Sequence, residues 1–146
     1  MKIRKSSATW EGGLKEGQGT IALGGGKIEV PYDFGARFED GAGSNPEELI
    51  GGAHAGCFSM ALAHELSQAG HPPVKIETTA RVHLEKAAEG FAIPKIELDT
   101  VADVPGVDEE TFQRLAQGAK QNCPVSKVLS SAEIVLAATL RSAQGT

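Results

Sequence analysis

The stretch from residue 46 to residue 69 most constrains the fold, because it has the pattern of one uninterrupted helix with a start and a stop signal. Asn45 can cap this helix, Pro46 suits its first position, and Glu48 completes an arrangement like a capping box. Gly70 and the two prolines that follow end it near Ala69. Because small residues surround the helix on most sides, we expect it to be central and closely packed. The residues expected along one side are Leu49, Ile50, Ala53, Cys57, Met60 and Ala61.

The residues before this helix predict an antiparallel meander of three short strands. Glycines punctuate this region as turns. The glycine run at 24–26 leads into a strand and lacks the Lys-Ser/Thr pair and the following helix of a phosphate-binding loop, so we expect a turn there. The predicted strands span residues 2–10, 20–23 and 27–30.

The residues after the helix predict two strands, two helical pieces and a last strand. Val74–Leu84 alternates between apolar and polar residues, and Ile93–Val104 returns after a turn at Glu89-Gly90. A helix is expected from Asp108 to Asn122 and a shorter one to Leu129, separated by Cys123-Pro124. Glu133–Leu140 is apolar on both faces, which favours an inner strand or a subunit interface. Core-facing residues of the second strand are expected at Ile96, Leu98 and Ala102.

Strands segregated from helices in this way are typical of an α+β domain, and residues 1–146 are expected to form one domain. The net charge of -5 argues against nucleic acid or an anionic membrane as a partner. The basic N-terminus has no apolar segment behind it, so it does not read as a secretory signal. The apolar run at 134–138 is too short to cross a bilayer. We therefore expect a cytoplasmic protein with no membrane or nucleic-acid partner.

Two widely separated cysteines carry the chemical argument, since they match no short zinc or haem spacing and point to thiol chemistry. Cys57, in the middle of the long helix, is either a small core residue or a reactive thiol. Burial in an apolar helix raises the pKa of a thiol, so a reactive Cys57 needs a cationic neighbour. His54 and His64 lie on the same helix, but the permanently charged Arg37, in the loop that enters the helix, is the better candidate.

Cys123 precedes a proline at the start of a new helical turn, where free backbone N–H groups favour a thiolate; simple packing is the alternative. A metal site of Cys57, Cys123 and a histidine lacks paired ligand spacing, so no metal is expected. Glu47 has a structural role as an acid in the first turn, and a functional one if it holds Arg37 through a bidentate pair.

Together these segments resemble the OsmC/Ohr family of thiol peroxidases over nearly the whole chain. The motifs that carry the resemblance are Arg37-Phe38-Glu39, Asn45-Pro-Glu-Glu-Leu-Ile50 leading to His54-Ala-Gly-Cys-Phe-Ser59, and Asn122-Cys-Pro-Val-Ser-Lys127. The position of the arginine just before the long helix is more similar to the OsmC branch than to the Ohr branch.

The resemblance implies an OsmC-like α+β fold with antiparallel sheets, a long central helix and an intertwined homodimer. It implies that Cys57 attacks the peroxide, Cys123 resolves, Arg37 activates Cys57 and Glu47 holds Arg37. The implied substrate is an organic hydroperoxide, with hydrogen peroxide second. The resemblance further implies that an external dithiol regenerates the thiols, that no cofactor is needed, and that the protein serves the osmotic and oxidative stress response. Two alternatives stay open, a Cys/His metal-binding protein and a non-catalytic dimeric domain with packed thiols.

Overall fold

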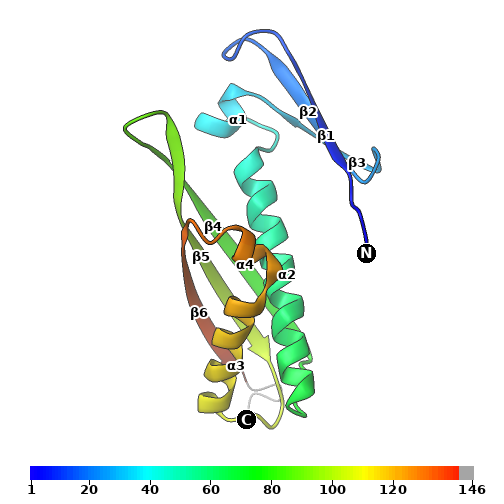
Figure 1. Ribbon diagram of the computed structural model, residues 1–146, viewed down its shortest axis with the longest axis vertical. Helices are drawn as coiled ribbons and strands as arrows, with labels where there is room; N and C mark the ends of the chain where they lie inside the picture. The colour runs from blue at the N-terminus through cyan, green and yellow to red at the C-terminus, as the bar shows by residue number, and fades with distance from the viewer. Residues whose placement is uncertain (142–146) are drawn as a thin grey trace. The chain divides into compact units, whose positions relative to one another are not determined.

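The computed structural model describes residues 1–141, which fall into two compact units, residues 1–49 and the residues from 50 onward (Figure 1). The α+β class predicted from the sequence is confirmed. No helix within residues 1–141 is long and apolar enough to span a membrane. The elements in chain order are β1 (Ser6–Glu11), β2 (Gln18–Leu23), β3 (Ile28–Tyr32), α1 (Phe34–Phe38), α2 (Pro46–Gln68), β4 (Lys75–Lys86), β5 (Phe91–Asp103), α3 (Glu109–Asn122), α4 (Pro124–Val128) and β6 (Glu133–Arg141).

The first unit contains the predicted meander, an antiparallel sheet in the order β1-β2-β3. The glycines that connect β2 to β3 turn the chain in the left-handed region, with φ between 61° and 97°, which favours glycine. β1 begins at Ser6 rather than at residue 2, because Ser6 pairs with Leu23, the last residue of β2 before that turn. Only Ala36 and Glu47 are buried within this unit, so its sheet has almost no core of its own.

The short helix α1 was missed, and the prediction that Arg37 lies in a loop was wrong. Asp33 caps α1 by accepting a hydrogen bond from the Ala36 backbone N–H at 2.8 Å. Five residues are too few to show a helical period, so the sequence pattern alone gave no sign of this turn.

Helix α2 has the predicted length and the predicted cap, in which Asn45 Oδ1 accepts from the Glu48 backbone N–H at 2.8 Å. Its buried face differs from the predicted one: the fully buried side chains are His54, Phe58, Leu62 and Leu66. None of the residues predicted for the apolar side is buried, and Met60 is 77% exposed. The prediction was wrong because small residues give this helix no dominant stripe, so large side chains spaced four residues apart decide which side packs.

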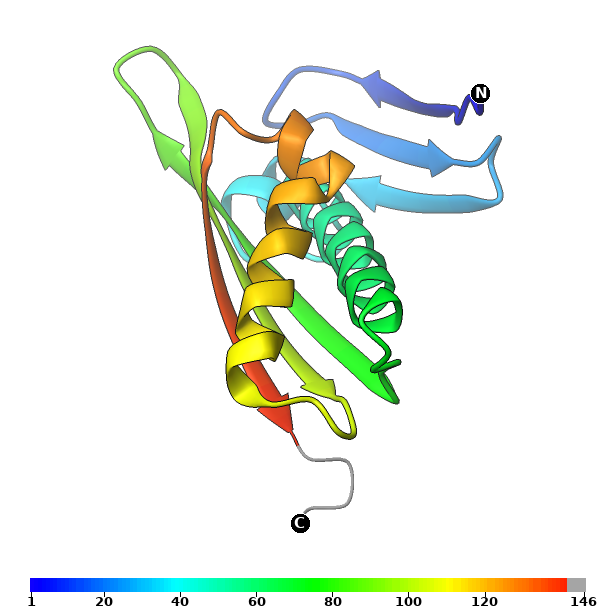
Figure 2. The same ribbon diagram turned by 60° about the horizontal axis from the view of Figure 1, so that its bottom comes forward.

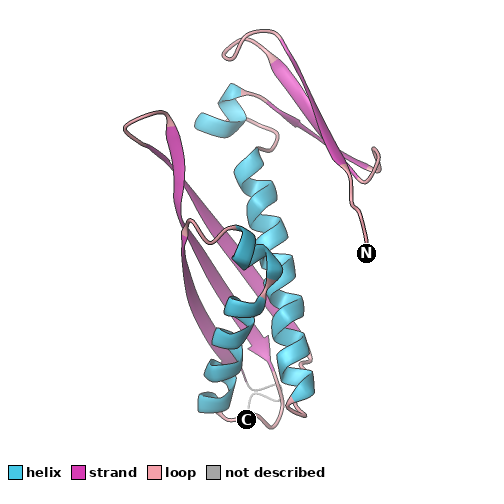
Figure 3. Cartoon of the chain, viewed as in Figure 1, coloured by secondary structure: helices cyan, strands magenta, loops and turns pink. Residues whose placement is uncertain are grey.

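The second unit contains a three-stranded sheet in the order β4-β5-β6 (Figure 3). β4 and β5 are antiparallel as predicted, but β5 and β6 are parallel, so the expectation of antiparallel sheets was wrong for this pair. The reason is that α3 and α4 carry the chain back between β5 and β6, as a parallel connection requires. Among residues 1–141, β6 pairs only with β5, and its residues alternate between exposed and half-buried. The prediction of an inner strand was therefore wrong, and the subunit interface stays a prediction.

Helices α2 and α3 lie on the same face of this sheet (Figure 2). Their contact with β5 forms the core, and truncating a large side chain in such a core typically costs about 2–5 kcal/mol. This packing brings the middle of α2 beside the junction of α3 and α4. The buried core residues are Phe58, Leu62, Leu66, Leu98, Ala102, Val104, Phe112, Leu115, Ala116 and Ala119.

Candidate active site

The two cysteines meet in the second unit, with their Sγ atoms 2.8 Å apart. Cys57 comes from the middle of α2, and Cys123 from the junction of α3 and α4. Both are free thiols; Cys57 is half-buried and Cys123 is fully buried. The structure therefore brings together the two residues to which the sequence assigned the thiol chemistry.

Pro124 creates the junction that presents Cys123. Proline cannot continue the hydrogen bonding of α3, so that helix ends at Asn122 and Cys123 takes an extended conformation. The Cys123 N–H still donates to the Ala119 carbonyl at 3.0 Å, while its carbonyl accepts from Lys127 N–H at 3.1 Å. Cys123 thus joins the end of α3 to the start of α4, as the sequence predicted, and both helices fix its position.

The two thiols have opposite pKa shifts. Burial, followed by the hydrogen bond to Cys123, raises the pKa of Cys57, and the backbone N–H of Val125 only partly offsets this. Burial alone would raise the pKa of Cys123 too, but its contact with Cys57 and its place at the start of α4 outweigh burial, so the pKa of Cys123 is lowered. Among the described residues 50–141, no group fully offsets the raised pKa of Cys57.

A buried polar pair behind Cys123 was missed by the sequence analysis. His54 Nε2 lies 2.7 Å from Ser126 Oγ, and both residues are buried. Their spacing was the available signal, because His54 precedes Cys57 by three residues and Ser126 follows Cys123 by three, which puts each on the same helix face as its cysteine. Burial lowers the pKa of His54. A neutral His54 is not the cation that Cys57 needs.

Cys57 lines a mainly apolar groove of about 410 Å³. The groove runs along one side of α2 and past the break at Cys123, so a small molecule in it can reach the Cys57 sulfur. The other residues that line the groove are Met60, Ala61, His64, Glu65, Asn122 and Pro124.

Arg37 and Glu47 form a bidentate pair in the first unit, as the sequence suggested. Arg37 Nε donates to Glu47 Oε1 at 3.1 Å, and Arg37 Nη2 donates to Oε2 at 2.8 Å. The Glu47 side chain is 9% exposed, whereas that of Arg37 is 37% exposed. A buried carboxylate that holds both sides of the fork fixes the direction of the guanidinium and leaves the rest of it accessible.

The accessible part of Arg37 borders an apolar hollow of about 240 Å³. Its guanidinium carbon lies 5.3 Å from the centre of the Phe38 ring. An arginine beside apolar surface can bind an anion or a polar oxygen while the apolar part of the same molecule contacts the rings. The hollow is lined by Trp10, Leu14, Tyr32, Asp33, Phe34, Arg37 and Phe38.

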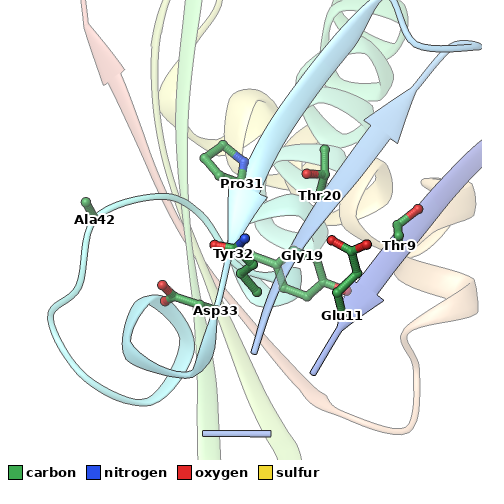
Figure 4. Close-up of a pocket in the computed structure, with 9 residues that line it drawn as sticks. Thr9, Glu11, Gly19, Thr20, Pro31, Tyr32, Asp33 and Ala42 are labelled. Atoms are coloured by element: carbon green, nitrogen blue, oxygen red, sulfur yellow. The ribbon is translucent and has the colours of Figure 1, made fainter. Parts of the chain in front are cut away.

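A second hollow, of about 300 Å³, lies on the sheet of the first unit (Figure 4). Its lining comes from β1, β2, β3 and the segments after β3, and its charged groups are Glu11 and Asp33. Asp33 already caps α1, and no thiol lines this hollow. It offers no peroxide chemistry of the kind the cysteine pair supports.

The candidate residues thus form two pairs in different units, Cys57 with Cys123 and Arg37 with Glu47. The part of the chain that the structure describes contains no group of three or more His, Cys, Asp or Glu side chains placed to hold a metal ion.

Comparisons with known proteins give a consistent result. The family model described as OsmC-like protein matches residues 39–138. Peroxiredoxin OsmC of Escherichia coli (strain K12) is 51% identical over 140 residues, which span 95% of this chain and 97% of that protein. Organic hydroperoxide resistance protein OhrB of Bacillus subtilis (strain 168) is 33% identical over 94 residues, which span 63% of this chain and 66% of that protein.

The solved structures agree on the fold. An organic hydroperoxide resistance protein OsmC from Legionella pneumophila matches with a TM-score of 0.71 at 22% identity, over 95% of this chain and 99% of that one. At that identity the match bears on the fold alone, and it confirms the OsmC-like fold that the sequence predicted.

Proposed function

This chain belongs to the OsmC family, and on that premise we propose that it is a thiol peroxidase that reduces organic hydroperoxides. The observation that carries the proposal is the 2.8 Å approach of a groove-facing thiol, Cys57, to a fully buried one, Cys123. The relatives named peroxiredoxin and organic hydroperoxide resistance protein support the same role.

The cycle that this pair supports has three steps. The Cys57 thiolate attacks one peroxide oxygen, the O–O bond breaks, and the alcohol leaves, so that Cys57 becomes a sulfenic acid. Cys123 then attacks the Cys57 sulfur, which forms a disulfide and releases water. An external dithiol reduces this disulfide by exchange and is itself oxidised. The cycle needs no metal or organic cofactor.

In this proposal Arg37 activates Cys57, and Glu47 orients Arg37. The support is the need for a cation, because burial raises the pKa of Cys57 and no group among the described residues 50–141 reverses this. A guanidinium held on one side by Glu47 can contact both a thiolate and a peroxide oxygen with its remaining donors.

The apolar groove at Cys57 supports organic hydroperoxides as the substrate class, with hydrogen peroxide as a second substrate. Met60, Ala61 and Pro124 give an alkyl or aryl group apolar surface, whereas hydrogen peroxide gains nothing from it.

We further propose one OsmC-like domain that functions as an intertwined homodimer in the cytoplasm, where a dithiol pool is kept reduced. The sheet of the first unit has almost no core, and Met60 and Val128 are 77% and 82% exposed, so a second copy has apolar surface to cover. Light scattering at micromolar concentration tests the dimer; the mass of one 15.2 kDa chain would contradict it.

Counting free thiols before and after treatment with cumene hydroperoxide, together with a metal assay, tests the function. The proposed peroxidase loses both thiols of each chain to a reversible disulfide and contains no stoichiometric metal. A metal-binding protein retains metal through purification, and a domain with merely packed thiols keeps both thiols; either result would contradict the proposal.

A further inference from the structure

Two contacts join the two segments that carry the cysteines. One is the contact between the Cys57 and Cys123 Sγ atoms, at 2.8 Å. The other is a hydrogen bond between His54 Nε2 of α2 and Ser126 Oγ of α4, at 2.7 Å. Each partner of this bond lies three positions from the cysteine of its own segment, so the bond lies about one helical turn from the sulfur contact. The cycle above gives the second contact no role.

The hydrogen bond is buried at both ends. The exposed fraction is 0% for His54 and 5% for Ser126. Nδ1 of His54 has no hydrogen-bond partner among residues 1–141, so within that range the bond to Ser126 is the hydrogen bond of this ring. Burying a polar group is costly unless it is hydrogen-bonded, so loss of either partner leaves the other buried and unpaired. The two residues therefore resist separation.

Ser126 also anchors α4. It is the only buried residue among residues 124–128. Cys123 is the N-cap residue of this helix, and its carbonyl accepts a hydrogen bond from the Lys127 backbone N–H at 3.1 Å. The bond that holds α4 to α2 therefore also holds Cys123 beside Cys57.

The two contacts respond differently to oxidation of Cys57. The sulfur contact joins two thiols, and it changes when the Cys57 sulfur gains an oxygen. The hydrogen bond between His54 and Ser126 involves neither sulfur, so the oxidation leaves both of its partners chemically unchanged. In the sulfenic acid it is the contact that keeps Cys123 within reach of Cys57.

We propose that His54 and Ser126 are positioning residues, whose hydrogen bond holds Cys123 against the Cys57 sulfenic acid and so directs that acid to the disulfide rather than to over-oxidation. The inference rests on the proposed peroxidase function and adds to it the pair that decides what becomes of the sulfenic acid. In this role neither residue needs to contact the peroxide.

Two reactions compete for the sulfenic acid. In the first, the Cys123 sulfur attacks the Cys57 sulfur: the S–S bond forms, the S–O bond breaks, and the departing hydroxide combines with the proton of Cys123 to give water. In the second, the sulfenic sulfur attacks another hydroperoxide molecule: the O–O bond breaks, the alcohol leaves, and Cys57 becomes a sulfinic acid. The first is intramolecular, so its rate depends on how closely the two sulfurs are held, whereas the second rises with peroxide concentration.

A peroxide titration tests this competition. The protein turns over cumene hydroperoxide with dithiothreitol as the reductant, and mass spectrometry measures the fraction of Cys57 present as sulfinic acid. Ser126→Ala removes the hydroxyl and should lower the peroxide concentration that over-oxidises half of the chains by about fivefold, because one typical hydrogen bond is lost. A concentration equal to that of wild type would overturn the proposal.

Ser59→Ala is the matched control. Ser59 lies on α2 two residues beyond Cys57, and its Oγ lies 2.8 Å from Thr78 Oγ1 of β4. The variant removes a hydroxyl bond from the same helix, but one directed to the sheet rather than to the segment of Cys123. It should leave the over-oxidising concentration unchanged. An equal fall in Ser59→Ala and Ser126→Ala would show a general loosening of α2 and would overturn the positioning role.

The equilibrium of the disulfide tests the same bond without peroxide. The Cys57–Cys123 disulfide is equilibrated in mixtures of oxidised and reduced dithiothreitol, and free thiols are counted. In Ser126→Ala and in His54→Leu the disulfide should be about fivefold less favoured, which raises its reduction potential by about 20 mV. His54→Gln keeps a group that can hydrogen-bond Ser126 and should shift the potential less. Potentials equal to that of wild type in Ser126→Ala and His54→Leu would overturn the proposal.

The two residues act through one bond, so their effects should not add. The double variant His54→Leu/Ser126→Ala should have the reduction potential of either single variant, and additive shifts would contradict a shared bond. These equilibria use no peroxide, so their failure is distinct from failure of the peroxidase function.

Discussion

Cys57 and Cys123 touch through their sulfur atoms, but their surroundings differ. Cys57 faces a groove from the side of a continuous helix, where the backbone N–H groups are already used by the helix. Cys123 is fully buried at a break between helices, and its contact with Cys57 lowers the pKa of its thiol. Cys57 is therefore the thiol that a substrate can reach, and Cys123 is the thiol with the lowered pKa.

This difference shows that the position of a cysteine and the pKa of its thiol are set by different parts of the structure. A buried sulfur with a lowered pKa suits the resolving and leaving roles, because neither requires contact with substrate. A half-buried sulfur with a raised pKa suits peroxide attack only when a cation lowers that pKa. We infer that the cation is Arg37, for which Glu47 already fixes the direction.

We expect the largest effect on turnover when each of the two sulfurs is removed in turn. Cys57→Ser should abolish turnover, because the attacking sulfur is lost. Cys123→Ser should still form one sulfenic acid per chain and then stop. Stopped-flow single-turnover measurements with a sulfenic acid probe distinguish the two, and equal rates in Cys57→Ser and wild type would reject the assignment.

The next largest effect is expected when Cys57 loses its proposed activator. Arg37→Ala should slow the peroxide step at neutral pH by about tenfold or more and shift its pH profile upward, because an opposite charge beside an acid typically lowers its pKa by about 1–3 units. The measurement is the rate of peroxide reduction across pH.

Two variants serve as comparisons for Arg37. Glu47→Gln should act in the same direction more weakly, by loosening Arg37 without removing it. Arg81→Ala removes an arginine that is also paired with carboxylates, Glu97 and Asp99, but on an exposed face of the sheet, and should leave the rate unchanged. A rate and pH profile in Arg37→Ala that match wild type would show that Cys57 has another activator.

The smallest expected effect concerns the pH dependence of the free energy of unfolding, through His54. The pKa of His54 is lowered in the folded protein, so below its unfolded value near 6.5 the unfolded chain binds the proton more readily. The free energy of unfolding should therefore fall as pH decreases from 6.5, by at most about 1.4 kcal/mol per pH unit, until the folded pKa is reached.

His54→Gln should remove this part of the acid destabilisation. Urea titrations between neutral pH and about pH 5 test it, with His64→Gln as the control for an exposed histidine on the same helix. The same slope in His54→Gln and wild type would show that His54 is not the group responsible.

The sequence predicted the elements well because their signals are local. Asn45 and Pro46 mark the start of α2, and Pro124 marks the break that presents Cys123. The buried face of α2 and the parallel pairing of β6 were not predictable in this way. Both depend on which distant side chains pack together, as Phe58 and Leu62 do against β5, and no local pattern records that choice.

The residues of the candidate site differ in the same respect, because some have a local signal in the sequence and others do not. The sequence could single out Cys57, Cys123, Arg37 and Glu47 as candidates because each is a distinctive residue type in a recognisable motif. Ser126 was not found, because a serine in a short helix is common and gains its meaning only from the buried imidazole 2.7 Å away.

The most direct test of the whole account is peptide mapping after one equivalent of cumene hydroperoxide per chain. We predict a Cys57–Cys123 disulfide within each chain, as expected for sulfur atoms that already lie 2.8 Å apart. The finding that would contradict the account is Cys57 over-oxidised to a sulfinic or sulfonic acid while Cys123 stays a free thiol in the wild-type protein.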